Sequence, residues 1–213
     1  KPQNLKKVYL VMRCEKNDIC AVIPIGGKGT RLRELTIDIP KPLFPINGES
    51  TLLRACKQLC NFGIKKIYIT ISYNHKQCIK HIEEIQKILS LEISTFVENE
   101  PLGECGSLWK IKEKLSKTII FINGDLIFSV DFNKFFGFHQ RINSDLTLAT
   151  HTSSHPEDSD LVSAPNGIQI KSIYLKSDPN HSCIKAYLGN AGIGLIERIL
   201  LDEIPQPENI KSS

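Results

Sequence analysis

Short apolar segments alternate with longer amphipathic segments over the first 125 or so residues of this 213-residue chain. The first apolar segment, Ile19–Ile25, reads ICAVIPI and ends at two glycines, which is typical of a parallel strand buried on both faces. Further strands are predicted at residues 65–73, 93–97 and 118–122, and helices at 51–63, 74–89 and 104–115. This alternation predicts an α/β fold: a doubly wound, mostly parallel, Rossmann-like sheet with helices on both faces.

The pattern changes after Asp125. The predicted elements there are a helix at 131–142, a strand at 145–152, a loop at 152–167, a half-exposed strand at 167–175 and one or two strands within 184–196. We expect these segments to add an antiparallel part to the sheet. Residues 1–18 are basic and weakly patterned, so the predicted organisation is a leader of uncertain order followed by a single domain at 19–213.

Composition and charge argue against several classes of protein. A formal net charge of +4 without a long basic run does not suggest a nucleic-acid binder. No apolar run reaches the roughly 18 residues that span a membrane, and the piece VYLVM is too short for a signal peptide. The seven cysteines are scattered without a C-x-x-C pair, which favours buried thiols over disulfides or zinc. We therefore expect a cytoplasmic protein with no nucleic-acid and no membrane partner.

A glycine-rich, basic stretch follows the first predicted strand and reads GGKGTRLRELTIDIPKPLFPING. Glycines allow backbone N–H groups to approach a ligand closely, and Arg and Lys neutralise negative charge, so a polyphosphate ligand is predicted. The spelling differs from a P-loop, and Leu32 occupies the last glycine position of a dinucleotide fingerprint. Asp125 follows a later strand. Ligands of doubly wound sheets lie beyond the carboxyl ends of the strands, where both features are expected.

Several motifs follow one another in order between residue 19 and about 198: GGKGTRL, then PKPL and PING, then ENEPLGECGSL, then NGD, then GIQIKSIYLKSDP, and finally NAGI. Together they resemble the motifs of the sugar-1-phosphate nucleotidyltransferases. Small members of this family include heptose and mannose 1-phosphate guanylyltransferases. The resemblance implies a reaction in which a sugar 1-phosphate and a nucleoside triphosphate (NTP) give a nucleotide sugar and pyrophosphate. The implied partners are the NTP and the sugar 1-phosphate, and a homo-oligomer is left open.

The implied chemistry is electrostatic rather than acid–base. The attacking atom is a phosphate oxygen that is already anionic, so no general base is needed, and catalysis consists of positioning and charge neutralisation. The resemblance implies that backbone N–H groups of Gly26, Gly27 and Gly29 surround the triphosphate, together with the Thr30 hydroxyl. Gly103, in the later P-L-G segment, would also belong to the nucleotide site.

Three charged residues are expected to be catalytic. Arg31 would bind the leaving β- and γ-phosphates through its planar guanidinium and thereby also belongs to the nucleotide site. Lys41, held between two prolines, would lie at the α-phosphate and the attacking phosphate. Asp125 would bind Mg²⁺, the one cofactor expected, which bridges phosphate oxygens.

Glu98 is the candidate for reading the nucleobase. A carboxylate accepts hydrogen bonds, and guanine offers two adjacent donors, N1–H and the 2-amino group, whereas uracil and thymine offer one N–H flanked by carbonyl oxygens. A preference for GTP is therefore expected. The alternative is that Glu98 faces solvent and that Glu100 or backbone groups read the base.

The expected sugar-phosphate contacts are Lys176 and Asn190, with two departures from the family pattern. The position before the lysine, usually Glu, is Leu175, so the usual recognition of a sugar hydroxyl is not expected. The family's second metal-binding Asp, in a D-[IM]-G-T-P segment near the C-terminus, has no counterpart before Ser213, so the domain is expected to lack its usual C-terminal end.

Three alternatives to guanylyl transfer remain open. One is a catalytically silent, nucleotide-sugar-binding regulatory subunit of the same fold, and another is a uridylyl- or cytidylyl-transferring relative. The third is a glycosyltransferase with an Asp-x-Asp motif at 158–160, although this stretch is rich in Ser and Pro and is better explained as a solvated loop.

Overall fold

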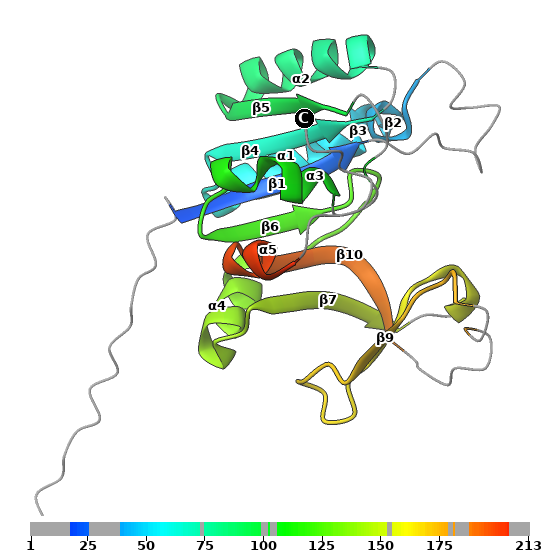
Figure 1. The fold of residues 1–213 in the computed structure, drawn as a ribbon. Coiled ribbons are helices and arrows are strands. Elements are labelled where there is room, and N and C mark those ends of the chain that lie inside the picture. Colours follow the sequence, from blue (N-terminus) through cyan, green and yellow to red (C-terminus); the bar gives the residue numbers. More distant parts are fainter. Residues whose placement is uncertain are drawn as a thin grey trace, which may run out of the picture.

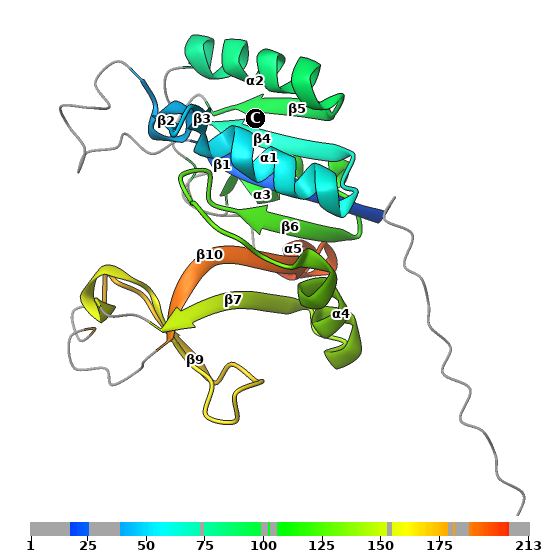
Figure 2. The same ribbon diagram turned by 180° about the vertical axis from the view of Figure 1, so that it is seen from behind.

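A computed structural model describes residues 18–25, 39–72, 75–98, 102, 106–152, 155–178, 181 and 188–204. Its main feature is an eight-stranded sheet in which the path of neighbouring strands is β5-β4-β1-β6-β10-β8-β9, with β7 also paired to β10. The first four strands on this path are parallel: β5 (Glu92–Val97), β4 (Lys66–Ile71), β1 (Ile19–Ile25) and β6 (Thr118–Ile122). The predicted mostly parallel, doubly wound sheet is confirmed, and Figures 1 and 2 show it from its two sides.

Helices cover both faces of the parallel strands (Figures 1 and 2). One face packs against α1 (Thr51–Phe62), α2 (His75–Leu89) and α4 (Phe132–Ile142), and the other against α3 (Gly106–Ile111) and α5 (Ile199–Glu203). Each face of the sheet packs in its own apolar core, and the side chains of β1 divide between the two. Ile19, Ala21 and Ile23 lie in the core beneath α1, and Cys20 and Val22 lie in the core beneath α3. Because strand side chains alternate between faces, a strand buried on both sides must be apolar throughout.

Local sequence signals set the ends of α1. Ser50 precedes the helix, and its hydroxyl accepts a hydrogen bond from the backbone N–H of Leu53, which satisfies one of the unpaired donors at the N-terminus. Gly63 ends the helix at φ 98°, a left-handed conformation that costs glycine nothing. Just before α1, the strands β2 (Pro45–Ile46) and β3 (Glu49–Ser50) form a small hairpin, and its turn residues Asn47 and Gly48 both have positive φ.

The remaining strands extend the sheet in the antiparallel sense, as expected. Strand β10 (Leu188–Glu197) pairs with β6, with β7 (Leu146–Thr152) and with the short β8 (Leu161–Ser163), which pairs in turn with β9 (Ser172–Tyr174). Figure 1 shows β10 and β7 running together from the parallel strands toward β9. This antiparallel arm therefore lies directly beside β6, the last of the parallel strands.

Several predicted boundaries are wrong. Strand β9 has three residues instead of the predicted 167–175, and the predicted loop 152–167 contains β8 and the 3₁₀ turn η5 (Pro156–Asp158). The predicted helix 104–115 is α-helical from Gly106 only as far as Ile111, after which η4 (Lys112–Lys114) tightens the last turn. Within the described ranges, no helix combines the length and hydropathy needed to cross a lipid bilayer.

Candidate functional site

The site lies where the strand order of the parallel sheet reverses. From β1 the chain moves to β4 and β5 on one side, and then returns to β6 on the other side of β1. A crevice forms beyond the carboxyl ends of two strands whose connections leave in opposite directions, and this is where doubly wound sheets bind ligands. Here the two ends are Ile25, which precedes the glycine-rich stretch, and Ile122, which precedes Asn123, Gly124 and Asp125.

Gly124 presses the Asp125 segment against the end of β1. Its backbone N–H donates to the carbonyl oxygen of Pro24 at 3.2 Å. A Cβ atom at this position would lie 2.5 Å from Cγ2 of Ile25 and 2.7 Å from the Pro24 oxygen, so no other side chain fits without displacing β1. The glycine therefore brings Asp125 directly to the switch point.

Lys41 and Asp125, 84 residues apart in sequence, form an ion pair at this edge. The Lys41 Nζ atom lies 2.6 Å from Oδ2 of Asp125, and each side chain is 40% exposed. Lys41 begins the 3₁₀ turn η3 (Lys41–Leu43), and the prolines on either side of it, Pro40 and Pro42, both restrict the backbone. Two of the three residues expected to be catalytic are thus adjacent, and both the ammonium group and the carboxylate are accessible to solvent.

The Asp125 carboxylate fits a Mg²⁺ ligand. Mg²⁺ usually takes one or two protein carboxylates, with phosphate oxygens and water completing the octahedron. Among the described residues no cluster of three or more His, Cys, Asp or Glu side chains is present, so the described part of the chain offers no all-protein cage. A single exposed carboxylate at the switch point is the donor set expected for a metal that arrives with a nucleotide.

A cavity of about 780 Å³ opens beside this edge, within the usual size range of small-molecule sites. Lys176 and Asn190, the two residues expected to bind the sugar phosphate, both line the cavity. Asn123, Asp158 and Asp160 line it as well, although the sequence does not single them out for this role. The cavity therefore combines one ammonium group with amide and carboxylate groups.

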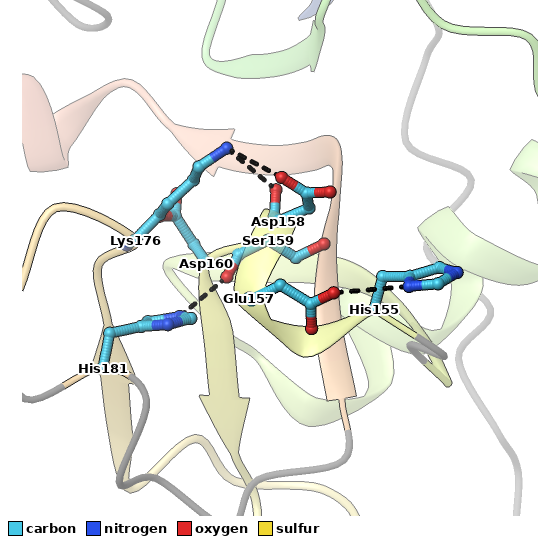
Figure 3. Close-up of polar contacts among 7 residues, drawn as sticks. All are labelled: His155, Glu157, Asp158, Ser159, Asp160, Lys176 and His181. Carbon is cyan, nitrogen blue, oxygen red and sulfur yellow. Dashed lines mark hydrogen bonds and ion pairs between the residues drawn. The ribbon is translucent and has the colours of Figure 1, made fainter.

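Lys176 is held between the two aspartates (Figure 3). Its backbone N–H donates to Oδ1 of Asp160 at 2.8 Å, and its Nζ lies 3.4 Å from both Oδ1 and the backbone oxygen of Asp158. In the same turn Glu157 points the other way and pairs with His155 at 3.3 Å. The stretch consists of the end of η5 and the two residues after it, and both aspartates border the cavity, whereas Glu157 contacts His155 instead.

Asn190 projects from an irregular part of β10. The pairing register of β10 with β7 shifts between Asn190 and Gly194, and Gly192 has φ +70°. The side-chain oxygen of Asn190 accepts a hydrogen bond from the Gly192 N–H at 3.0 Å, which closes the turn. The Gly192 carbonyl accepts the backbone N–H of Asn123 at 2.9 Å. This bulge joins the cavity to the segment that carries Asp125.

Glu98 follows β5 at the same edge of the sheet and is only 8% exposed. Its Oε2 atom accepts a hydrogen bond from the backbone N–H of Leu102 at 3.3 Å, and its own N–H donates to the carbonyl of Ile71 at 2.8 Å. Within the described ranges its Oε1 atom makes no hydrogen bond. A buried carboxylate with a free oxygen can accept from a ligand donor, and the solvent-facing alternative does not match its burial.

The other residues of the expected nucleotide site lie outside the described residues. These are Gly26, Gly27, Gly29, Thr30, Arg31 and Gly103, and the competing base contact Glu100 lies outside them too. Their roles stay predictions.

Residues 20–180 match the family model described as nucleotidyl transferase. The chain is 30% identical to a mannose-1-phosphate guanylyltransferase of Mycobacterium tuberculosis over 197 residues, which is 91% of this chain and 53% of that protein. It is 28% identical to the mannose-1-phosphate guanylyltransferase catalytic subunit beta of Dictyostelium discoideum, covering 90% of this chain and 53% of that one. The chain thus spans about half the length of these curated relatives.

Two solved structures are similar. HddC from Yersinia pseudotuberculosis, which has also been crystallised in complex with GMP-PN, superposes with a TM-score of 0.71 at 25% identity, covering 87% of this chain and 80% of that one. A putative glucose-1-phosphate thymidylyltransferase from Bacillus anthracis superposes with a TM-score of 0.77 over 92% of this chain and 76% of that one. At 20% identity, the second structure supports the fold alone.

Proposed function

Because this chain belongs to the nucleotidyl transferase family, we propose that it transfers a nucleotidyl group from an NTP, preferably GTP, to a sugar 1-phosphate. The observation that carries the proposal is the Lys41–Asp125 pair at the switch point, next to a cavity lined by Lys176 and Asn190. Lys41 at the switch point and Lys176 in the adjoining cavity could each neutralise the charge of a phosphorylated substrate.

In the proposed reaction an oxygen of the sugar 1-phosphate attacks the α-phosphorus of the NTP. The new bond joins that oxygen to the α-phosphorus, the bond from the α-phosphorus to the β-phosphate oxygen breaks, and pyrophosphate leaves. No proton has to be removed from the attacking group. The barrier is the repulsion between two anions, so groups that neutralise charge in the transition state are the ones expected to matter.

The described residues divide this work between them. Lys41 would leave Asp125 and neutralise the α-phosphate and the attacking phosphate, and Lys176 would hold the phosphate of the sugar. Asp125 would hold Mg²⁺, which when bound supplies positive charge to phosphate oxygens. Asp158 and Asp160 would accept hydrogen bonds from hydroxyl groups of the sugar, which compensates for the apolar Leu175 at the usual acidic position.

Guanine is the favoured base for two reasons. Glu98 is buried and retains a free oxygen within the described ranges, as a bidentate contact to guanine N1–H and its amino group requires. Two relatives are named mannose-1-phosphate guanylyltransferases, and the similar HddC was crystallised with GMP-PN, by its name a guanine nucleotide. A mannose-type or heptose-type 1-phosphate is therefore the first acceptor to test.

The test is pyrophosphate release by the purified protein with Mg²⁺, each of five NTPs (GTP, ATP, CTP, UTP and dTTP) and a panel of sugar 1-phosphates. We expect turnover with GTP and with mannose or heptose 1-phosphate. The Lys41→Met variant is the matched negative control. Turnover with UTP or CTP alone would identify a uridylyl- or cytidylyl-transferring relative. Nucleotide-sugar binding without turnover for any pair would support the silent regulatory subunit.

A further inference from the structure

Thr51, the first residue of α1, connects the two segments that carry Lys41 and Asp125. Its hydroxyl oxygen lies 3.1 Å from the carbonyl oxygen of Pro42 and 3.0 Å from the carbonyl oxygen of Gly124. Thr51 is 3% exposed, so water does not compete for these contacts. A hydroxyl carries one hydrogen, which is therefore shared between the carbonyl that follows Lys41 and the carbonyl that precedes Asp125.

Little else in the described structure holds these two segments at a fixed separation. The Lys41–Asp125 ion pair is 40% exposed on both sides, and ion pairs of this kind contribute only about 0–1 kcal/mol. Within the described ranges, no backbone hydrogen bond joins η3 to residues 123–126. The buried hydroxyl is thus the polar link between them that solvent does not weaken.

Thr51 itself is rigidly placed. The preceding Ser50 caps the helix, and the following Leu52 is fully buried in the core between α1 and the sheet. Threonine is branched at Cβ, which restricts its χ1 angle. The core therefore holds the Thr51 hydroxyl in a fixed position, where it can bind both surface segments and set their separation.

We propose that Thr51 is a positioning residue for the transfer reaction: its hydroxyl sets the separation of the Lys41 ammonium group and the Asp125 carboxylate. This inference rests on the proposed function. Without the hydroxyl, the two buried carbonyls lose their shared donor, and η3 can shift relative to the end of β6. A displacement of about 1 Å in a catalytic group can reduce the rate about 100-fold.

The matched variants are Thr51→Val, which keeps the shape and removes the hydroxyl, and Thr51→Ser, which keeps the hydroxyl. Thr70→Val is the control, because the Thr70 hydroxyl is buried and makes no hydrogen bond within the described part of the chain. We expect Thr51→Val to lower kcat about 10- to 100-fold while KM for the NTP stays within about 3-fold. Thr51→Ser and Thr70→Val should stay within about 3-fold of wild type. Loss of kcat that serine does not restore would overturn the inference.

A second readout does not depend on turnover. The rate at which the Lys41 amine is acetylated, measured by mass spectrometry, reports its pairing with Asp125. We expect slow acetylation in wild type, Thr51→Ser and Thr70→Val, and acetylation several-fold faster in Thr51→Val, approaching Asp125→Asn. Thr51→Ala replaces the valine variant if that variant does not fold. Equal acetylation rates in wild type and the hydroxyl-free variant would overturn the inference. Absence of turnover in wild type would overturn only the proposed function, because acetylation would still test the link.

Discussion

Among single residues, Asp125 has the most demanding part in the proposed chemistry, because it is the proposed Mg²⁺ ligand. We predict that Asp125→Asn lowers kcat by about 100-fold or more, as for loss of a preorganised electrostatic group. Its ion pair with Lys41 is exposed, so the melting temperature should change little. Kinetics across a Mg²⁺ titration and thermal unfolding measure both effects. Glu83→Gln, exposed on α2, is the control, and near-normal activity of Asp125→Asn would disprove the metal role.

Glu98 is expected to determine which nucleobase the site prefers. Within the described residues, Glu98 Oε1 makes no hydrogen bond, and Oε2 accepts only from the Leu102 N–H. Both oxygens can therefore accept hydrogen bonds from guanine. Glutamine has one acceptor oxygen and presents an amino group instead of the other. We predict that Glu98→Gln lowers kcat/KM for GTP about 10- to 100-fold, the value of hydrogen bonds to a charged group. Steady-state kinetics with all five NTPs, and with exposed Glu92→Gln as control, check this. An unchanged nucleotide ranking would remove Glu98 from the base pocket.

The cavity residues should affect the sugar substrate and not the nucleotide. We predict that Lys176→Met raises KM for the sugar 1-phosphate about 10-fold or more, because the phosphate loses a charged partner. Asp160→Asn should raise the same KM and leave KM for the NTP unchanged. Glu157→Gln is the matched control, since this neighbour pairs with His155 and does not line the cavity. Equal increases in KM for the sugar 1-phosphate and KM for the NTP would mean that these substitutions disturb the fold and not a sugar-phosphate contact.

At the scale of secondary-structure elements, alanine substitutions at two glycines should change stability for different reasons, one through packing and the other through helix propensity. An alanine Cβ at position 124 would lie within 3 Å of Ile25 and Pro24, whereas at position 137 in α4 it would meet nothing within 4 Å. We predict that Gly124→Ala destabilises the protein by about 1–3 kcal/mol, the range for overpacking, and also lowers activity. Gly137→Ala should stabilise it by about 0.5–1 kcal/mol. Urea unfolding and kcat measure both, and a Gly124→Ala variant with wild-type stability would contradict the packing argument.

Elements with a strong apolar period were predictable from the sequence. Strand β1 has the predicted bounds, and α1 ends within one residue of its prediction, because a buried strand and an amphipathic helix each leave a periodic pattern. The three residues of β8 are too few to show a period, so residues 161–163 were expected in a loop. Helix α3 ends as an α-helix at Ile111, and the rest of the predicted helical pattern forms the 3₁₀ turn η4, a common ending that periodicity alone does not distinguish from an α-helix.

Part of the candidate site was expected from motifs in the sequence. Lys41 and Asp125 stand in recognisable motifs, and the sheet topology brings both to one edge. Asp160 could not be found in this way, because the register that pairs Leu161 with Tyr174 is what places it against Lys176. Such a register depends on the whole antiparallel arm. The Thr51 link is hidden for the same reason, since its partner Gly124 lies 73 residues away in sequence.

For the molecule as a whole, stability depends on two apolar cores, and several of their members are cysteines. Burial raises the pKa of the Cys56 thiol from its ordinary value of 9.0 to about 12, and that of the Cys78 thiol to about 11. Burial likewise raises the pKa of the Cys20 thiol. The folded protein therefore keeps these thiols protonated at a pH where the unfolded chain ionises. The unfolded state then binds fewer protons, so the free energy of unfolding must fall as the pH rises above about 9.

We predict that the free energy of unfolding falls less steeply with rising pH in Cys56→Ala than in wild type. With an unfolded pKa of 9.0, Cys56 alone lowers the free energy of unfolding by about 1.4 kcal/mol between pH 8 and 10. Urea unfolding in reducing buffer across that range measures the slope, and subtracting the variant from wild type removes the contribution of tyrosines and lysines. Val22→Ala is the control, because it also opens a buried site but has no proton to lose, and should keep the wild-type slope. Identical slopes in wild type and Cys56→Ala would mean that the Cys56 thiol ionises equally in the folded and unfolded states.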